Sequence, residues 1–349
     1  MNSIIKEIIN KKSNGSVEYT PKDFKAPIDV RWCAGCGGYS ILAQVQRIMP
    51  GLGIPKEKIT FVSGIGCSSR FPYYMNIYGF HSIHGRALAI ASGLKIARPD
   101  LSLWVVTGDG DCMSIGGNHF IHACRRNVDL NVLMFNNEIY SLTKGQYSPT
   151  SKQGQKTKSS PLGALDDPFN PAALALGSGA TFVARGMDND TKELQYLFER
   201  AAAHKGLSFV EIYTNCVIFN DAAFDAFGSK ENRKEKTVKL ENGKPLIFGE
   251  NNDKGIKLDG FKPVVVSLAD GKWSADDLLV HDETDSTLAF IIANMTYNPE
   301  VPRPMGVMQA ITNKTYDEKV EAQIEFESSK YEKNDVFELM KGEDFWEIA

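Results

Sequence analysis

The stretch LSLWVVTGDGD, residues 101–111, joins an apolar run to a glycine-rich acidic end. The apolar part, Leu101 to Thr107, has the length and composition of a buried strand that stops at Gly108. Two later runs have the same character: Leu130 to Phe135 (LNVLMF) and Leu207 to Tyr213 (LSFVEIY). We therefore predict that all three are strands of one buried sheet.

Amphipathic segments alternate with apolar runs from residue 27 to about residue 219, which predicts the fold class α/β, a mostly parallel sheet with helices on both faces. Asn118 to Arg126 (NHFIHACRR) is the expected crossover helix, with Asn118 as its cap. After Gly228 the sequence becomes charged and turn-rich, and prolines interrupt it. We expect three parts: an N-terminal lead-in over 1–26, a main domain over 27–228 and an irregular C-terminal extension over 229–349.

The chain has 349 residues, of which 42% are hydrophobic and 23% charged, the mix of a globular protein with a full core. Its formal net charge of −4 gives no indication of a nucleic-acid partner. The N-terminal sequence MNSIIKEIINKK lacks an apolar signal region, and no run reaches the ~20 apolar residues of a membrane span. We therefore expect a cytoplasmic protein with no membrane partner. Its six cysteines should serve metal, redox or core roles rather than disulfides.

Two polar segments follow two of the predicted strands. GDGD begins at Gly108, and Asn136-Asn137 ends the next apolar run. Because parallel strands end at one edge of their sheet, both segments should meet where open α/β sheets bind ligands. Gly108 and Gly110 allow the backbone to turn tightly beside a phosphate, and Asp109 and Asn137 offer the oxygen ligands that Mg²⁺ prefers. The spacing predicts a site for Mg²⁺ and a diphosphate, whereas a lone GDG would indicate only a strand-end turn.

The cysteines form a second pattern. Cys33 and Cys36 lie in WCAGCGG and Cys67 in GIGCSSR, where glycines let the backbone wrap closely around a compact group. Four thiolates would hold either Zn²⁺ or a 4Fe-4S cluster, and a C-x-x-C alone would also suit a redox dithiol. Spacing does not choose between these metals. Nor does it choose the fourth ligand, for which there are three candidates: Cys112, Cys124 and Cys216.

The order of motifs resembles that of a known family. WCAGCG, GIGCSS, IHGRA, GDGD and NNEIYSLTKGQYSPTS follow one another as in the small (beta) subunits of 2-oxoacid:ferredoxin oxidoreductases. The resemblance covers roughly residues 27–220. It implies the thiamine-diphosphate-binding fold, in its diphosphate-type domain, with thiamine diphosphate, Mg²⁺ and a 4Fe-4S cluster as cofactors.

The resemblance also assigns ligands. Asp109, the Asn137 side chain and the Ile139 backbone carbonyl would bind Mg²⁺, beside Gly108 and Gly110 at the diphosphate. The cluster would be held by four thiolates: Cys33, Cys36, Cys67 and Cys216. Cys124 would then have a core role.

Three further residues are candidates with competing interpretations. Ser68 would donate to the cofactor phosphate or cap a helix, and His84 would contact the diphosphate or satisfy a buried hydrogen bond. Lys144, in LTKGQ, would place a catalytic positive charge near the substrate carboxylate or lie in solvent. His119 and His122 have no third ligand beside them, so we interpret them as structural.

The resemblance implies CoA-dependent oxidative decarboxylation of a 2-oxoacid, or the reverse carboxylation, with electrons passed to ferredoxin. His281 to Met295 and Pro302 to Ala310 resemble the 2-oxoglutarate-using members, so succinyl-CoA and CO₂ are the expected products. Pyruvate and branched-chain 2-oxoacids are the alternative substrates. The carboxylate that activates thiamine is missing here, so we expect an alpha subunit to complete the active site. A non-redox thiamine decarboxylase or carboligase subunit and a zinc-stabilised binding subunit are the rival functions.

Overall fold

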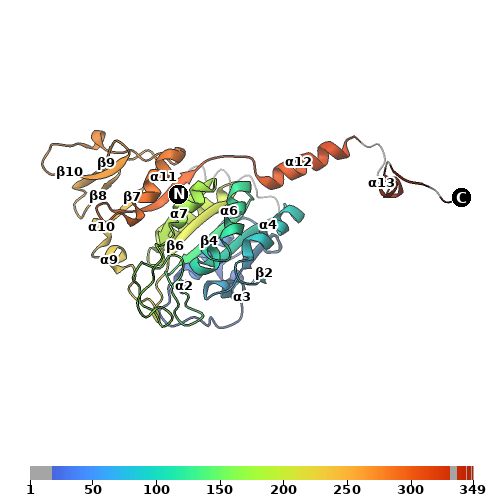
Figure 1. Ribbon diagram of the computed structural model, residues 1–349, viewed down its shortest axis with the longest axis horizontal. Coiled ribbons are helices and arrows are strands. Elements are labelled where there is room, and N and C mark those ends of the chain that lie inside the picture. The colour runs from blue at the N-terminus through green and yellow to red at the C-terminus, as the bar shows by residue number, and fades with distance from the viewer. Residues whose placement is uncertain (1–17, 331–335, 343, 347, 349) are drawn as a thin grey trace.

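A computed structural model describes residues 18–330, 336–342, 344–346 and 348. Most of the expected lead-in, residues 1–17, lies outside the described residues. The main element is an eight-stranded sheet with strand order β2-β1-β3-β4-β6-β5-β11-β7 (Figure 1). Its strands are β1 (Ile59–Ser63), β2 (Tyr78–His81), β3 (Ser102–Gly108), β4 (Asn131–Asn136), β5 (Phe182–Met187), β6 (Ser208–Tyr213), β7 (Thr237–Leu240) and β11 (Arg303–Ala310).

The first six strands in this order are all parallel to one another. Strand β11 runs antiparallel to β5, and β7 pairs with β11 in parallel at the far edge. The three predicted strands are present as β3, β4 and β6, and they lie side by side in the sheet. The carboxyl ends of β3 and β4, which carry the GDGD and Asn136-Asn137 segments, are therefore neighbours.

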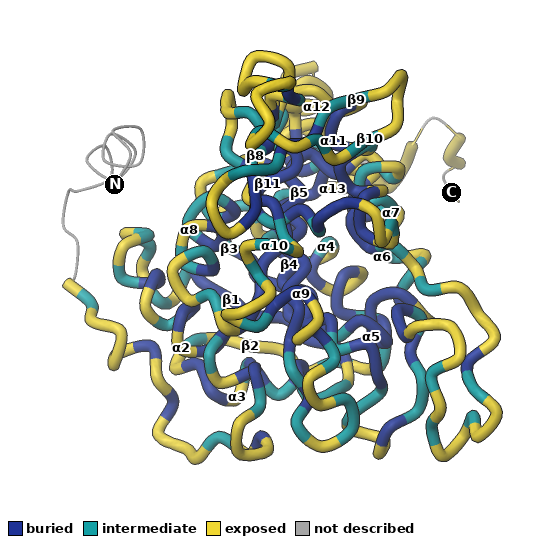
Figure 2. Tube along the Cα trace, turned by 90° about the vertical axis from the view of Figure 1, so that its left-hand side faces the viewer, coloured by how far each residue is buried: buried dark blue, intermediate teal, exposed yellow. Residues whose placement is uncertain are grey.

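Side chains of β3 alternate between two hydrophobic cores, one on each face of the sheet. Leu103 and Val105 pack in one core, and Trp104 and Val106 pack in the other. The first core is covered by α4 (Ala87–Ala97), α6 (Gly117–Arg126), α7 (Pro171–Gly177) and α11 (Ser286–Asn294). The second is covered by α2 (Gly38–Ile48), α3 (Phe71–Tyr74) and α8 (Thr191–Ala203). Figure 2 shows the buried residues gathered along the central strands between these layers.

The expected crossover helix is α6, but its predicted cap is wrong. The residue at its N-cap is Gly116, so Asn118 lies inside the helix and does not cap it. Within the GDGD segment, Asp109 begins the short helix α5 (Asp109–Met113), which directly follows β3. Its tight turn follows from Gly108 and Gly110, which leave no side chain in the way.

The residues after 228, expected to form an irregular extension, contain regular strands and helices. β7 and β11 complete the main sheet, although prolines 302 and 304 had argued against a strand there. A separate antiparallel sheet contains β8 (Ile247–Phe248), β9 (Lys254–Asp259) and β10 (Lys262–Ser267). The short helices α9 (Asp225–Gly228) and α10 (Arg233–Lys236) lead into this region. Beyond it, α12 (Tyr316–Ser328) and α13 (Val336–Lys341) extend away from the body (Figure 1).

Candidate functional site

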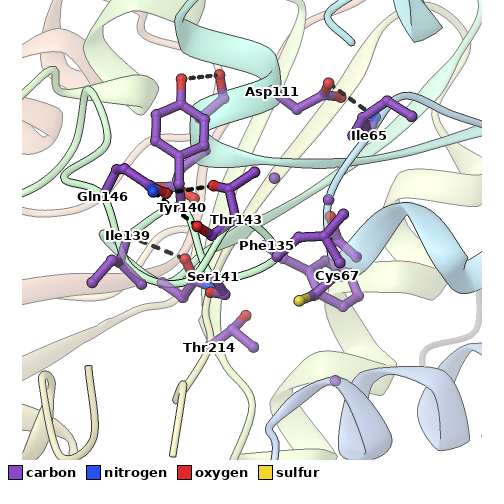
Figure 3. Close-up of a pocket in the computed structure, with 18 of the residues that line it drawn as sticks. Ile65, Cys67, Asp111, Phe135, Ile139, Tyr140, Ser141, Thr143, Gln146 and Thr214 are labelled. Carbon is purple, nitrogen blue, oxygen red and sulfur yellow. Dashed lines mark hydrogen bonds between the residues drawn. The ribbon is translucent and has the colours of Figure 1, made fainter. Parts of the chain in front are cut away.

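A cavity of about 600 Å³ lies at the carboxyl edge of the parallel strands (Figure 3). The loops after β1, β3, β4 and β6 all contribute to it. Its lining includes nine of the predicted site residues: Cys36, Cys67, Ser68, His84, Gly108, Asp109, Gly110, Asn137 and Ile139. Segments far apart in the sequence therefore meet where strand order and strand direction require it.

Asp109 is the first residue of α5 and is almost fully buried. The Ser148 and Thr150 hydroxyls donate to its Oδ2, at 2.5 and 2.7 Å. Burial raises the pKa of Asp109 to about 6, although these hydrogen bonds lower it. Among the described residues, no Lys or Arg forms an ion pair with this carboxylate. A buried carboxylate without a cation is a suitable ligand for a metal ion.

Asp111 holds the site together instead of facing a ligand. Its Oδ1 accepts hydrogen bonds from the Ile65 and Gly85 backbone N–H groups, at 3.1 and 2.7 Å, and lies 2.7 Å from His84 Nδ1. Its Oδ2 accepts from the Thr107 hydroxyl at 2.7 Å. Figure 3 shows this carboxylate turned toward Ile65. Asp111 therefore joins the loops after β1, β2 and β3, and it holds the His84 ring, which lines the cavity, at Nδ1.

The loop after β4 carries the other predicted Mg²⁺ ligands. Asn137 Oδ1 accepts from the Ile139 N–H at 3.3 Å, and Asn137 Nδ2 donates to Ser141 Oγ at 2.8 Å. Asn220 Nδ2 donates to the Asn137 carbonyl at 2.9 Å. Glu138 between them has a φ of 53° and is buried, which fixes a sharp turn. This turn brings Asn137 and Ile139 to the same cavity wall as Asp109.

Gly110 has a steric reason to be glycine. A Cβ there would lie 2.2 Å from Tyr140 Cε1, and the Tyr140 hydroxyl donates to the Gly110 carbonyl at 3.0 Å (Figure 3). At Gly108 a Cβ would lie 3.4 Å from Ser68 Oγ, on the cavity wall. A side chain at Gly110 would therefore overlap the Tyr140 ring, and one at Gly108 would contact Ser68 on the cavity wall.

A second cavity of about 210 Å³ adjoins the first and is lined by four cysteines: Cys33, Cys36, Cys67 and Cys216. Two hydrogen bonds join the three segments that carry them. Trp32 Nε1 donates to the Cys67 carbonyl at 2.6 Å, and the Gly37 N–H donates to the Asn215 carbonyl at 3.2 Å. Both cavities are lined by six residues in common: Trp32, Cys36, Cys67, Asn137, Ser141 and Leu142.

The thiols of the cysteine cavity are partly buried and lie near one another. Burial, followed by the neighbouring thiols, raises the pKa of Cys67 to about 11, and burial also raises the pKa of Cys36. Within the described part of the chain, no three His, Cys, Asp or Glu side chains converge tightly enough for a single metal ion. Zn²⁺ would need all four thiolates around one point, whereas a four-iron cluster binds each thiolate at a different corner.

The remaining cysteines lie elsewhere. Cys112 on α5 and Cys124 on α6 are both buried in the first core, and neither lines the cysteine cavity. Burial raises the thiol pKa of both residues. Of the three sequence candidates for a fourth thiol, the structure thus brings only Cys216 beside the other three.

Lys144 is not brought together with the other candidates. It is exposed, has a φ of 77° in a tight turn and lies outside the lining of both cavities, although its neighbour Thr143 lines the larger one. The sequence reasoning missed Ser148, Thr150 and Tyr140, which contact Asp109 or its loop. Ser148 and Thr150 lie in the GQYSPTS segment, which is part of the family resemblance but gave no role for its hydroxyls.

Comparison with known proteins gives a consistent result. Residues 64–212 match the family model described as thiamine pyrophosphate enzyme, C-terminal TPP binding domain. The 2-oxoglutarate oxidoreductase subunit KorB of Mycobacterium tuberculosis is 50% identical over 305 residues, which cover 87% of this chain and 81% of that protein. The 2-oxoacid:ferredoxin oxidoreductase subunit beta of Saccharolobus solfataricus is 45% identical over 60% of this chain and 68% of its own length.

A solved structure extends the likeness to nearly the whole chain. It is the 2-oxoglutarate:ferredoxin oxidoreductase from Magnetococcus marinus with 2-oxoglutarate, coenzyme A and succinyl-CoA bound, 31% identical with a TM-score of 0.76. The match covers 95% of this chain and 98% of that one. The resemblance and the α/β fold class inferred from the sequence are therefore confirmed. This chain belongs to the family of 2-oxoacid:ferredoxin oxidoreductase beta subunits.

Proposed function

We propose that this chain is the thiamine-diphosphate-binding subunit of an enzyme that converts 2-oxoglutarate and CoA to succinyl-CoA and CO₂, with electrons passed to ferredoxin. The observation that carries the proposal is the pair of adjoining cavities. One has a buried carboxylate and an amide at the carboxyl edge of the sheet, and the other has four cysteines. The same site would support the reverse carboxylation.

The larger cavity fits Mg²⁺ and a diphosphate. Asp109, the Asn137 side chain and the Ile139 carbonyl would hold the metal, while the backbone at Gly108 and Gly110 approaches the diphosphate. Ser68 lies buried in the same wall, so its hydroxyl would donate to phosphate. The support for this arrangement is the buried, cation-free Asp109 carboxylate, since a divalent ion would offset the cost of its burial.

The smaller cavity fits a 4Fe-4S cluster held by Cys33, Cys36, Cys67 and Cys216. When bound, thiamine diphosphate would supply an electron sink for decarboxylation, and the cluster would accept the electrons one at a time. The chain's own residues set the distance between these two groups. Because Cys36, Cys67 and Trp32 line both cavities, the thiolates would lie directly between cluster and cofactor.

An alpha subunit would complete the active site. Among the residues that the structure describes, Asp109 and Asp111 are the only carboxylates lining the larger cavity, and Asp111 is fully occupied by hydrogen bonds. The carboxylate that activates thiamine must then come from another chain. The outward face of α4 supports such a partner because all of its exposed residues are apolar or small: Ala89, Ile90, Gly93, Ile96 and Ala97. Such a face, apolar and on a helix whose opposite side is packed in the core, is suited to burial against another chain.

The substrate assignment rests on the named relatives, two of which are described as 2-oxoglutarate enzymes. A distal carboxylate needs a cation, because leaving it buried and unpaired would cost several kcal/mol. Among the described residues, no Lys or Arg lines the larger cavity. Lys144, beside the lining residue Thr143, and the alpha subunit are therefore the candidate sources. The two segments that resemble the 2-oxoglutarate-using members do not line the cavity. They form α11, which packs on the sheet, and β11, which is a strand of it.

Among the described residues, no helix has the length and apolarity needed to cross a bilayer. A cytoplasmic location, with ferredoxin and CoA as soluble partners, is the setting that we propose.

A reconstituted complex tests the function. The chain is purified without oxygen, alone and with its alpha subunit, and assayed with CoA, ferredoxin and a panel of 2-oxoacids. We expect the isolated chain to be inactive and the complex to have a higher kcat/KM for 2-oxoglutarate than for pyruvate or branched-chain 2-oxoacids. A preference for pyruvate would refute the substrate alone. Zinc without iron or sulfide, or a colourless active carboligase, would refute the redox function.

A further inference from the structure

A turn with three buried hydroxyls lies behind the predicted metal ligands. Ser148, Thr150 and Ser151 are 3%, 0% and 2% exposed, so their hydroxyls have little access to water and need partners within the protein. The turn is closed by the Ser151 N–H, which donates to the Ser148 carbonyl at 3.0 Å. Ser151 Oγ in turn donates to the Glu138 carbonyl at 2.5 Å, which anchors the turn on the loop after β4.

Two of these hydroxyls converge on one carboxylate oxygen. Ser148 Oγ and Thr150 Oγ1 both donate to Asp109 Oδ2, and they lie 3.3 Å from each other. Because both hydroxyls donate to Oδ2, they fix the rotation of the carboxylate about its side-chain bond. Hydrogen bonds to an ionised group are stronger than those between neutral groups, so the orientation is well determined.

Thr150 also reaches the second ligand-bearing loop. Its Oγ1 lies 3.0 Å from Asn136 Oδ1, next to Asn137 in sequence. The orientation of the Asn136 amide is fixed in turn, because its Nδ2 donates to Glu211 Oε1 at 2.8 Å. Glu211 accepts from Arg185 Nε at 2.8 Å, and both of these side chains are fully buried. A continuous buried chain of contacts therefore runs from Arg185 to Asp109 through Thr150.

We infer that Ser148 and Thr150 are positioning residues for the metal site. They turn the Asp109 carboxylate toward the metal, and Thr150 sets the spacing between the strand ends that carry Asp109 and Asn137. The inference rests on the proposed function, because it assumes Mg²⁺ at Asp109. Outer-shell hydrogen bonds of this kind typically change metal affinity by about 10- to 100-fold when removed.

The test measures Mg²⁺ and cofactor binding rather than turnover. Thiamine diphosphate binding to the full complex is titrated calorimetrically at increasing Mg²⁺, and Mn²⁺ binding is followed by electron paramagnetic resonance. Thr150→Val keeps the shape of the side chain but removes the hydroxyl, and should raise the Mg²⁺ concentration for half-saturation by about 10-fold or more. Thr150→Ser should restore most of the affinity, since it keeps the hydroxyl.

A matched control separates positioning from folding. Thr181 is also buried, and its hydroxyl contacts Asn127 Oδ1 and His204 Nε2 at the opposite edge of the sheet. Thr181→Val should therefore leave Mg²⁺ affinity unchanged. If Thr150→Val does not fold, Ser148→Ala gives the same test with the other hydroxyl.

The outcomes distinguish a failure of the proposed function from a failure of the inference about Ser148 and Thr150. A wild-type complex that binds thiamine diphosphate without needing Mg²⁺ would overturn both the proposed function and this inference. Mg²⁺-dependent binding in the wild type, with equal affinity in Thr150→Val, would overturn the inference alone. Weakened binding in Thr150→Val with no rescue by Thr150→Ser would assign the loss to packing and also overturn it.

Discussion

Large cavities lie at both edges of the parallel sheet, but they differ in whether the buried carboxylate has a cationic partner. At the carboxyl edge, Asp109 lines about 600 Å³ of space and has no cationic partner among the described residues. At the amino edge, Lys95 and Asp129 line a cavity of about 490 Å³ and form an ion pair at 2.9 Å. Lys95 Nζ also donates to the Leu101 and Pro99 carbonyls, at 2.9 and 3.0 Å.

The pKa values follow this difference. Burial raises the pKa of Asp109 to about 6. Burial acts on Asp129 in the same direction, but the Lys95 ammonium outweighs it and holds the pKa of Asp129 below its usual value. A polar cavity is thus a poor guide to function by itself. The useful sign is a buried charge whose partner is missing, because that charge can be stabilised by a ligand.

The largest expected effect is the loss of cofactor binding in Asp109→Ala. Removing the charged ligand should abolish Mg²⁺-dependent thiamine diphosphate binding, a loss greater than the about 10- to 100-fold typical of outer-shell changes. The fold should be retained, because the variant removes a buried charge rather than a partner of one. Calorimetric titration checks the affinity, and thermal unfolding checks the fold. Unchanged cofactor affinity would contradict the site assignment.

Next is the cluster at the same edge. Cys216→Ala should remove the iron and the visible absorbance of the anaerobically purified protein, since one of four thiolates is lost. Cys124→Ala is the matched control, because that thiol lies on the buried face of α6, in the first core. It should keep the cluster with only a modest loss of stability. Full iron content in Cys216→Ala would show that another residue is the fourth ligand.

The amino edge should respond in stability and not in binding. Asp129→Asn leaves the buried Lys95 ammonium without its counter-charge, so the free energy of unfolding should fall by about 3 kcal/mol. Mg²⁺ and thiamine diphosphate affinities should not change. Denaturant unfolding with a parallel cofactor titration checks both. A variant that loses cofactor affinity while keeping its stability would remove the distinction between the two edges.

Lys144→Ala should have a smaller, substrate-dependent effect. If Lys144 pairs with the C1 carboxylate, kcat/KM should fall for every 2-oxoacid, whereas pairing with the distal carboxylate should lower it for 2-oxoglutarate alone. Its exposed position predicts a reduction rather than an abolition of activity. Steady-state kinetics on the substrate panel separate the two cases. Equal kcat/KM values in variant and wild type would mean that Lys144 lies in solvent and does not contact the substrate.

The sequence was sufficient for the strands and for the ligands that directly follow them. β3, β4 and β6 are continuous apolar runs, and the direction of parallel strands alone brings Asp109 and Asn137 to one edge. The positioning contacts were not predictable in this way. Thr150 reaches Asp109 across 41 positions of sequence, and no periodicity records such a contact.

The strands after residue 228 were not predicted from the sequence, for a different reason. Pro304 lies within β11, and a proline usually argues against a strand because it cannot donate a hydrogen bond. Here β11 nevertheless pairs with β5 and β7, with an irregular register between Val307 and Gln309. The tertiary pairing, which the sequence does not display, overrides the local signal.

The smallest expected effect concerns His204 at the amino edge. This ring contacts the Thr181 hydroxyl at 2.8 Å, and burial lowers its pKa to about 4, although the Asp129 carboxylate acts in the opposite direction. In the unfolded chain a histidine titrates near pH 6.5, so between pH 6.5 and 4 the unfolded state binds more protons than the folded state. His204 therefore destabilises the fold as the pH falls through this window, and its contribution is absent above it.

His204→Gln should remove that titration. The free energy of unfolding of the variant should depend less steeply on pH between 6.5 and 4, by at most about 1.4 kcal/mol per pH unit, which is the value for one proton. Denaturant unfolding at several pH values across the window, for wild type and variant, measures the difference. Cofactor binding at pH 7 should be equal in the two proteins, because the ring lies at the edge opposite Asp109. An equal pH dependence in both would mean that His204 is protonated in the folded protein as readily as in the unfolded chain.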